Sequence, residues 1–342
     1  MALERSILTE DGIRALLQEE YDLQADGIQR LKLGTANCYS VMVGETKYFL
    51  KEFQSGFRGE DLSREANLVN FLAEGGFPVA RFLLNKEKTP FVVRQDHFIA
   101  LEEYIEGFSY GYNDFPPRLL GQMAATLGKL HRAMQGAEVP LDMDKDWLNS
   151  FSAEATKKQY DAWLELLKQK PNDPHFDRIA EDFAAKKRLA ERCEGYKKYF
   201  DGITYSATHG DFQGCQLICG EDTIKAVIDF SSARRLPVVW EVMRSFVQTS
   251  AVGRTRTEID LPAFCDYVRE YLRYFPLSRA DLRAMPYVYL FQLARSKFGY
   301  KQYLTTDSED REGLIQFAFW RTAVCLELEK RAEEISWALG RI

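Results

Sequence analysis

Apolar residues follow two different spacings in the two halves of the chain. In the first third, short runs of β-prone residues separated by turn residues predict antiparallel strands. These runs cover residues 28–33, 38–43, 47–53, 79–84, 91–94 and 98–105. Two helices are predicted among them, one starting after the cap residue Thr9 and one over 62–73 that ends at Gly75-Gly76.

From Leu119 onward the apolar residues recur at intervals of three and four, which is typical of one face of a helix. Two lysine-rich helical stretches over 153–168 and 176–200 follow, then a compact segment of loops and strands over 203–230 and three more helices. The sequence therefore predicts an α+β protein. A small lobe with an antiparallel sheet is joined near residue 105 to a larger, mainly helical lobe.

Composition narrows the class of protein. The chain has 342 residues, enough for about two domains of ordinary size. Hydrophobic residues make up 46% and charged residues 28%, the proportions of a soluble globular protein. The formal net charge is -6, so no overall positive charge favours nucleic acid or an anionic membrane. The start does not resemble a signal peptide, and no apolar run approaches the roughly 18 residues of a spanning helix.

Cysteine usage indicates a reducing compartment. Six cysteines are scattered over a long chain, unlike the dense disulfide framework of a small secreted domain. Cys215 and Cys219 are four residues apart, but neither a second pair nor a neighbouring histidine completes a zinc site. We expect a cytoplasmic protein that binds neither nucleic acid nor membrane. The sequence leaves its oligomeric state open.

The most informative segment runs from His209 to Asp229. It places Asp211 in a glycine-containing loop, Gln216 five residues later, and Asp229 at the end of the apolar strand 226–228. Phosphoryl transfer from a nucleotide needs a carboxylate that orients the attacking hydroxyl and oxygen ligands for Mg²⁺. One carboxylate and one amide oxygen are a sensible protein share of a magnesium site, because Mg²⁺ keeps several waters.

This segment resembles the aminoglycoside phosphotransferase and choline kinase-like family, a branch of the protein-kinase-like fold. The family pattern is His-Gly-Asp, four residues, Asn, and then a strand ending in Ile-Asp-Trp or Ile-Asp-Phe, which Ile228-Asp229-Phe230 matches. Residues 127–132 look like the helix before the catalytic loop, and Glu241 stands where the family often has an acidic residue. The resemblance spans residues of about 28 to 245. It implies a nucleotide-binding lobe over 1–105 and, over 106–342, a lobe with the catalytic loop and the acceptor site.

The resemblance also implies an activity, the ATP- and Mg²⁺-dependent phosphorylation of a hydroxyl group on a small molecule. Asp211 would then orient the hydroxyl and accept its proton, while His209 would hold the catalytic loop by hydrogen bonds. Gln216 and Asp229 would hold Mg²⁺. Position 216 departs from the family, which usually has Asn there, and this departure supports an alternative: a non-catalytic kinase-like binding or structural protein, such as a spore-coat-type relative.

The first lobe carries a second set of candidate residues. Strand alternation places Lys51 between two inward-facing Phe residues, where an ammonium group needs an anionic partner. Glu65 lies on the apolar face of the next helix and could supply that partner, as in the lysine–glutamate pair of kinases. The resemblance further implies nucleotide contacts. They would come from Gly34 and Thr35 over the phosphates and from the linker Glu103, Tyr104 and Ile105 against adenine.

Other motifs favour other classes only weakly. No P-loop or dinucleotide-binding glycine pattern occurs. Residues 107–111 satisfy the G-x-S-x-G pattern of serine hydrolases, but Pro116-Pro117 opposes the helix that must follow, and no histidine follows His209. We expect His131 to be a core residue and His97 and His175 to be exposed.

The acceptor is not specified by the sequence. Family members phosphorylate aminoglycosides, amino alcohols such as choline, homoserine and sugars. Aromatic residues of the second lobe could wall a pocket for a cationic or sugar-like group, although aromatics at helical spacing more often belong to a core. They are Tyr287, Tyr289, Phe291, Phe298, Tyr300, Phe317, Phe319 and Trp320.

Overall fold

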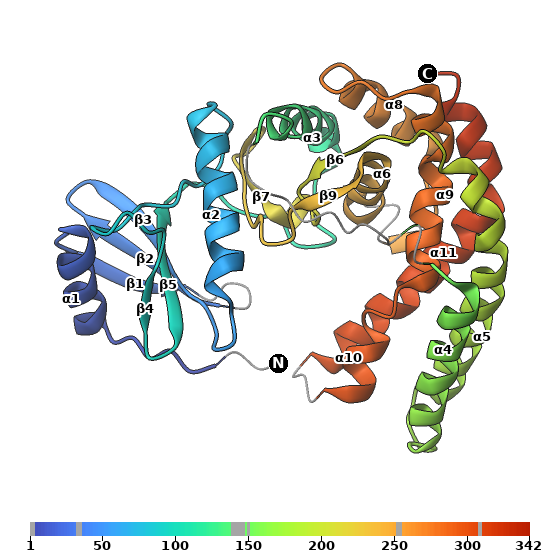
Figure 1. The fold of residues 1–342 in the computed structure, drawn as a ribbon, viewed down its shortest axis with the longest axis horizontal. Coiled ribbons are helices and arrows are strands. Elements are labelled where there is room, and N and C mark those ends of the chain that lie inside the picture. The colour runs from blue at the N-terminus through green and yellow to red at the C-terminus, as the bar shows by residue number, and fades with distance from the viewer. Residues whose placement is uncertain (1–3, 32–35, 138–147, 149–150, 251–254, 307–309) are drawn as a thin grey trace.

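The computed structural model describes residues 4–31, 36–137, 148, 151–250, 255–306 and 310–342. The predicted α+β architecture is confirmed, with an antiparallel five-stranded sheet in the first part and mostly helices in the second (Figure 1). Among the described residues, no helix combines the length and the apolar run that crossing a membrane would require.

The first lobe is a sheet between two helices. The strands are in the order β1-β2-β3-β5-β4, and α1 and α2 lie on opposite sides of the sheet (Figure 1). The elements are α1 (Glu10–Tyr21), β1 (Gly27–Leu31), β2 (Asn37–Val43), β3 (Thr46–Glu52), α2 (Gly59–Glu74), β4 (Val92–Arg94) and β5 (His97–Glu103). Thr9 caps α1 by accepting a hydrogen bond from the Gly12 N–H, and α2 ends at Gly75, as the sequence predicts.

One predicted strand is wrong. Residues 79–84 form only isolated bridges, Val79 with Val227 and Phe82 with Glu102, and no continuous strand. The side chain of Asn70 pairs with the backbone of Phe82 and holds this segment against α2. The parallel Val79–Val227 bridge ties the segment to the second lobe, so its β-prone residues serve to join the two lobes.

The second lobe contains two small two-stranded sheets surrounded by helices. Its strands are β6 (Tyr205–Thr208), β7 (Leu217–Cys219), β8 (Ile224–Val227) and β9 (Arg234–Pro237), paired as β6-β9 and β7-β8. Its helices are α3 (Leu120–Met134), α4 (Ala153–Lys168), α5 (Phe176–Cys193), α6 (Val238–Thr249), α8 (Leu261–Leu272), α9 (Arg279–Arg295), α10 (Tyr300–Thr305) and α11 (Arg311–Leu339). The described residues after 230 thus form five helices, more than the three that the sequence predicts, because α9, α10 and α11 are separate.

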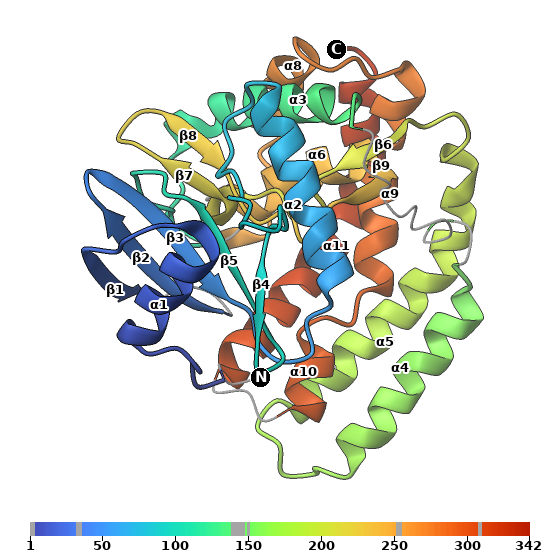
Figure 2. The same cartoon turned by 60° about the vertical axis from the view of Figure 1, so that its left-hand side comes forward.

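The lysine-rich pair α4 and α5 lies side by side at the edge of the molecule (Figure 2). The apolar side of the pair contacts α9, α10 and α11, and their polar sides face solvent. Solvated outer faces explain the low hydrophobicity of both helices.

The largest apolar core does not stop at the boundary between the lobes. Leu62, Leu68 and Leu72 of α2 belong to the same buried cluster as Met123 and Leu127 of α3. A separate cluster joins α1 to the other face of the sheet. The two predicted lobes therefore share their main core. The assignment of nucleotide binding to residues 1–105 and of the acceptor site to residues 106–342 stays a prediction.

Candidate active site

The predicted catalytic loop follows β6 and begins at the fully buried His209. The His209 Nε2 lies 3.0 Å from the carbonyl oxygen of Ile228, and Nδ1 accepts the backbone N–H of Asp211 at 3.2 Å. Nε2 therefore carries the ring proton. His209 thus fixes the backbone on either side of the loop to the strand end that carries Asp229, which makes it a positioning residue.

Glu241, in the first turn of α6, holds the same loop through hydrogen bonds to its backbone. Its carboxylate accepts the backbone N–H groups of His209 at 2.9 Å and Gly210 at 2.6 Å. It also lies 2.8 Å from Nε2 of His131, whose other ring nitrogen contacts the hydroxyl of Tyr271 at 2.8 Å. Burial by itself would raise the pKa of Glu241, but the hydrogen bond from His131 holds the pKa below its usual value. His131 is confirmed as a core residue.

Gly210 makes the sharp turn between these two anchors possible. Its φ is +81°, and a Cβ at this position would overlap the carbonyl oxygen of Ser232. Only glycine takes this conformation so close to another backbone segment without strain.

The three residues of the predicted catalytic and metal set come together. The Gln216 amide lies 3.0 Å from Oδ2 of Asp211 and 3.4 Å from Oδ2 of Asp229. The backbone carbonyl of Gln216 accepts the N–H of Ile228 at 3.0 Å, which fixes the spacing of the two segments. Asp229 adopts the left-handed conformation, with φ +64°, and accepts a hydrogen bond from Ser231 at 2.7 Å.

A second group of charges surrounds Lys51 on β3. Burial by itself would lower the pKa of the Lys51 ammonium, but the charges of Glu65, Glu102 and Asp229 raise it. Glu65 on α2 is 7% exposed, and it too has a raised pKa because it is buried, despite the opposing effect of Lys51. Lys51 and Glu65 interact through their charges, without a direct ion pair among the contacts of the described residues. Lys51 of the first lobe and Asp229 of the second lobe are therefore close enough for their charges to interact.

Sequence reasoning missed Glu102 as a member of this group. Glu102 is paired with Phe49 in the β3–β5 register, so its side chain shares the sheet face of Lys51. Burial raises the pKa of Glu102 to about 8, and the neighbouring charges of Glu65 and Asp229 act in the same direction. The signal in the sequence is strand alternation, which points Glu102 inward and Glu103 outward.

This raised pKa predicts a pH-dependent effect of Glu102→Gln. A carboxyl that titrates near 4.5 when unfolded and near 8 when folded lowers stability as pH rises between these values. We expect Glu102→Gln to raise the melting temperature at pH 8 relative to wild type, with a smaller gain at pH 5. The control is Glu103→Gln, on the exposed face of the same strand, which should follow the wild-type pH profile. An equal effect of Glu102→Gln at both pH values would contradict the prediction.

The structure also adds Arg244, one turn after Glu241 on α6. Its guanidinium forms an ion pair with the carboxylate of Asp211, and its side chain is 11% exposed. Arg244 lies outside every motif quoted above, and its contact with Asp211, 33 residues earlier in the chain, left no local signal in the sequence.

The structure describes only some of the remaining residues predicted to contact the nucleotide. Gly34 and Thr35 lie outside the described residues. Glu103 ends β5; its backbone N–H donates to the Arg81 carbonyl, and its side-chain carboxylate accepts the Arg81 N–H at 3.3 Å. The ring of Tyr104 lies 3.8 Å from the Lys47 ammonium. Ile105 follows, partly buried, as the chain leaves the sheet. Their contact with adenine stays a prediction.

The alternative motifs find no support. Ser109 donates its hydroxyl hydrogen bond to the carbonyl of Leu217 at 2.9 Å, and Phe108 pairs with Cys219, so residues 107–111 connect the lobes. In the described part of the chain, no cluster of three His, Cys, Asp or Glu side chains could hold a metal ion alone.

The expected exposure of His97 is wrong. The residue is buried, and its Nδ1 lies 3.0 Å from the carbonyl oxygen of Phe53.

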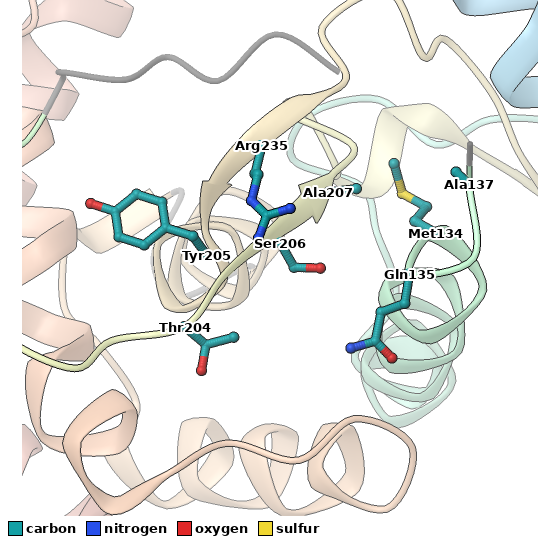
Figure 3. Close-up of a pocket in the computed structure, with 8 residues that line it drawn as sticks. All are labelled: Met134, Gln135, Ala137, Thr204, Tyr205, Ser206, Ala207 and Arg235. Carbon is teal, nitrogen blue, oxygen red and sulfur yellow. The ribbon is translucent and has the colours of Figure 1, made fainter. Parts of the chain in front are cut away.

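One pocket, of about 310 Å³, lies away from these residues (Figure 3). It is lined from the end of α3 and from strands β6 and β9. The lining residues are Met134, Gln135, Ala137, Thr204, Tyr205, Ser206, Ala207 and Arg235. None of the predicted catalytic or nucleotide residues is among them, and the chain that follows Ala137 lies outside the described residues.

Comparison with known proteins places the chain in a family. The sequence model of the phosphotransferase enzyme family matches residues 27–276, and the chain belongs to this family. A search by sequence among curated proteins found no match.

Solved structures confirm the kinase-like fold. A microcompartment-associated aminopropanol kinase superposes with a TM-score of 0.67 at 16% identity, covering 96% of this chain and 99% of the other. An aminoglycoside phosphotransferase from Alicyclobacillus acidocaldarius gives 0.64 at 16% identity, with 97% and 98% covered. A spectinomycin phosphotransferase in complex with ADP and spectinomycin gives 0.63 at 16% identity, with 98% and 100% covered.

Proposed function

We propose that this phosphotransferase is an ATP- and Mg²⁺-dependent kinase that phosphorylates a hydroxyl group of a small molecule. The observation that carries the proposal is the convergence of Asp211, Gln216 and Asp229, with Lys51 beside Asp229. Related structures support nucleotide use, since one contains ADP and an amicoumacin kinase contains AMP-PNP and Ca²⁺.

The donor set fits a magnesium ion. Burial by itself would raise the pKa of Asp229, but Lys51 and the Ser231 hydrogen bond hold it below its usual value, so the carboxylate is charged at neutral pH. The Gln216 amide presents its nitrogen to both carboxylates here, and a half-turn of that amide would present its oxygen instead. When bound, Mg²⁺ would supply charge stabilisation for the nucleotide phosphates.

The other residues have distinct tasks in this proposal. Lys51, held charged by the carboxylates around it, would bind the phosphates of ATP. Asp211 would accept a hydrogen bond from the acceptor hydroxyl and take its proton as the hydroxyl oxygen bonds to the γ-phosphorus and the bond from that phosphorus to the ADP oxygen breaks. Catalysis would rest on this positioning and on charge stabilisation, since kinases of this fold form no covalent intermediate with the protein.

A non-catalytic kinase-like protein is the alternative, and Gln216 is the observation that favours it. Gln is longer than the usual Asn by one methylene, whereas Mg²⁺ demands near-ideal octahedral geometry. Against this alternative, Lys51, Glu65, Asp211 and Asp229 are all retained and brought together. We also propose the cytoplasm as the site of action, because the six cysteines are scattered over a long chain and do not form the dense framework of a small secreted domain.

The test is calorimetric titration with a non-hydrolysable ATP analogue, with and without Mg²⁺, on wild type and Gln216→Asn. We expect magnesium-dependent binding to both proteins, with affinities within about tenfold, because both side chains carry an amide oxygen. A wild type that does not bind, with binding recovered in Gln216→Asn, would instead support a kinase fold reused without catalysis. Gln135→Asn, in the pocket of Figure 3, is the matched control.

A further inference from the structure

Positive charge gathers beside Asp211 in the second lobe. Arg244 pairs with the Asp211 carboxylate and also lies 3.5 Å from the carbonyl oxygen of Phe212. The guanidinium has five N–H donors in a rigid fork, so these contacts leave donors to spare. Arg244 can therefore bind a further anionic oxygen next to the catalytic carboxylate.

Arg321 of α11 is a second buried guanidinium, and no ion pair joins it to a carboxylate of the described residues. Its side chain contacts the Gln292 amide oxygen at 3.5 Å, and the residue is 8% exposed. Its Nε has no hydrogen-bond partner among the described residues, and none of their carboxylates forms an ion pair with it. Burial of an unpaired charge is unfavourable, so an anion is the partner expected for this group.

Helix α6, which carries Arg244, and helix α11, which carries Arg321, both pack against α9. Burial lowers the pKa of Arg321, and the charge of Arg244 lowers it further. Tyr289 of α9 is fully buried and interacts with the charges of both. Lys186 of α5 is a third buried cation, and its charge interacts with those of Arg321 and Asp182. Its ammonium donates to the backbone carbonyls of Leu293 and Ser296 at 3.1 and 2.8 Å.

We infer that the acceptor carries an anionic oxygen group, a carboxylate or a phosphate ester, which Arg321 and Arg244 bind while its hydroxyl faces Asp211. This inference rests on the proposed kinase function and narrows the class of substrate. Arginine binds both groups in the same forked geometry. A polycationic acceptor, such as an aminoglycoside, would meet repulsion from the same cations.

The test measures anion binding directly. Thermal unfolding of wild type is followed while phosphate or acetate replaces chloride at constant ionic strength. We expect saturable stabilisation by at least one of them, with phosphate alone indicating a phosphate ester and acetate a carboxylate. In Arg321→Gln and Arg244→Gln, the half-saturating concentration should rise about tenfold or more, the effect of losing a charge-assisted hydrogen bond.

Further variants keep the result decisive. Arg321→Lys retains a charge without the fork and should bind with intermediate affinity, even if Arg321→Gln folds poorly. Lys51→Met, in the nucleotide site, and Arg192→Gln, whose exposed side chain pairs with Glu329, should keep the anion effect. The inference is overturned if neither anion stabilises wild type, if the effect disappears in Lys51→Met but not in Arg321→Gln, or if kanamycin binds. None of these results bears on ATP binding, so failure here differs from failure of the proposed function.

Discussion

Asp211→Asn is expected to lower kcat by about 10²- to 10⁴-fold, the usual contribution of a positioned general base. The Asn side chain keeps the shape and one oxygen for Gln216, but it cannot take the proton of the acceptor hydroxyl. It also loses the ion pair with Arg244. Nucleotide affinity should change by less than about threefold, because Lys51 and Asp229 remain in place.

The measurement is acceptor-dependent release of ADP, combined with calorimetry of a non-hydrolysable ATP analogue on the same preparations. Asp222→Asn is the matched control. Asp222 lies in the turn between β7 and β8, its side chain is 79% exposed, and it forms an ion pair with Arg118 at the surface. Near-normal turnover in Asp211→Asn would remove Asp211 from the mechanism. A parallel loss of nucleotide binding would show that the variant disturbs the site as a whole.

Glu241→Ala is expected to lower the free energy of unfolding by roughly 3–5 kcal/mol, the loss found when one member of a buried charged network is removed. The deletion leaves the backbone N–H groups of His209 and Gly210 and the ring of His131 without their acceptor in a water-free interior. The catalytic loop should lose its conformation with them, so turnover should fall as well.

Urea unfolding of the two proteins measures this difference, with Glu154→Ala as the control. Glu154 is 77% exposed in the first turn of α4, so its removal should cost less than about 0.5 kcal/mol. Glu241→Gln keeps one carbonyl acceptor and should fall between wild type and Glu241→Ala. Equal unfolding midpoints for Glu241→Ala and wild type would show that the loop holds its shape without this anchor.

The proximity of Asp211, Gln216 and Asp229 could be predicted from the sequence because its determinants are local. Asp211 and Gln216 are five residues apart, and Asp229 follows the strand that pairs with the segment after Gln216, so short-range geometry alone brings them close. Lys51 and Glu65 could also be predicted, because strand alternation and the apolar helix face both point a charged residue inward.

The remaining features depend on long-range contacts that no local pattern reports. Arg244 pairs with Asp211 from helix α6, and the charge of Arg321, on α11 and about eighty residues further along the chain, interacts with that of Arg244. The segment 79–84 has the residues of a strand, yet its partners lie in the second lobe. His97 looks exposed among polar neighbours, but the chain after β3 folds over it.

The apolar core that joins α2 to α3 limits how the two halves of this fold can be exchanged between relatives. A hybrid that joins residues 1–105 of this chain to the second half of a relative at 16% identity would place Leu68 and Leu72 against unmatched side chains. In a close-packed interior, a change in side-chain volume of even one methylene group lowers the stability of the fold. We therefore expect the two halves to fold well only as a matched pair, so that substitutions within this chain should preserve the fold better than an exchange of lobes.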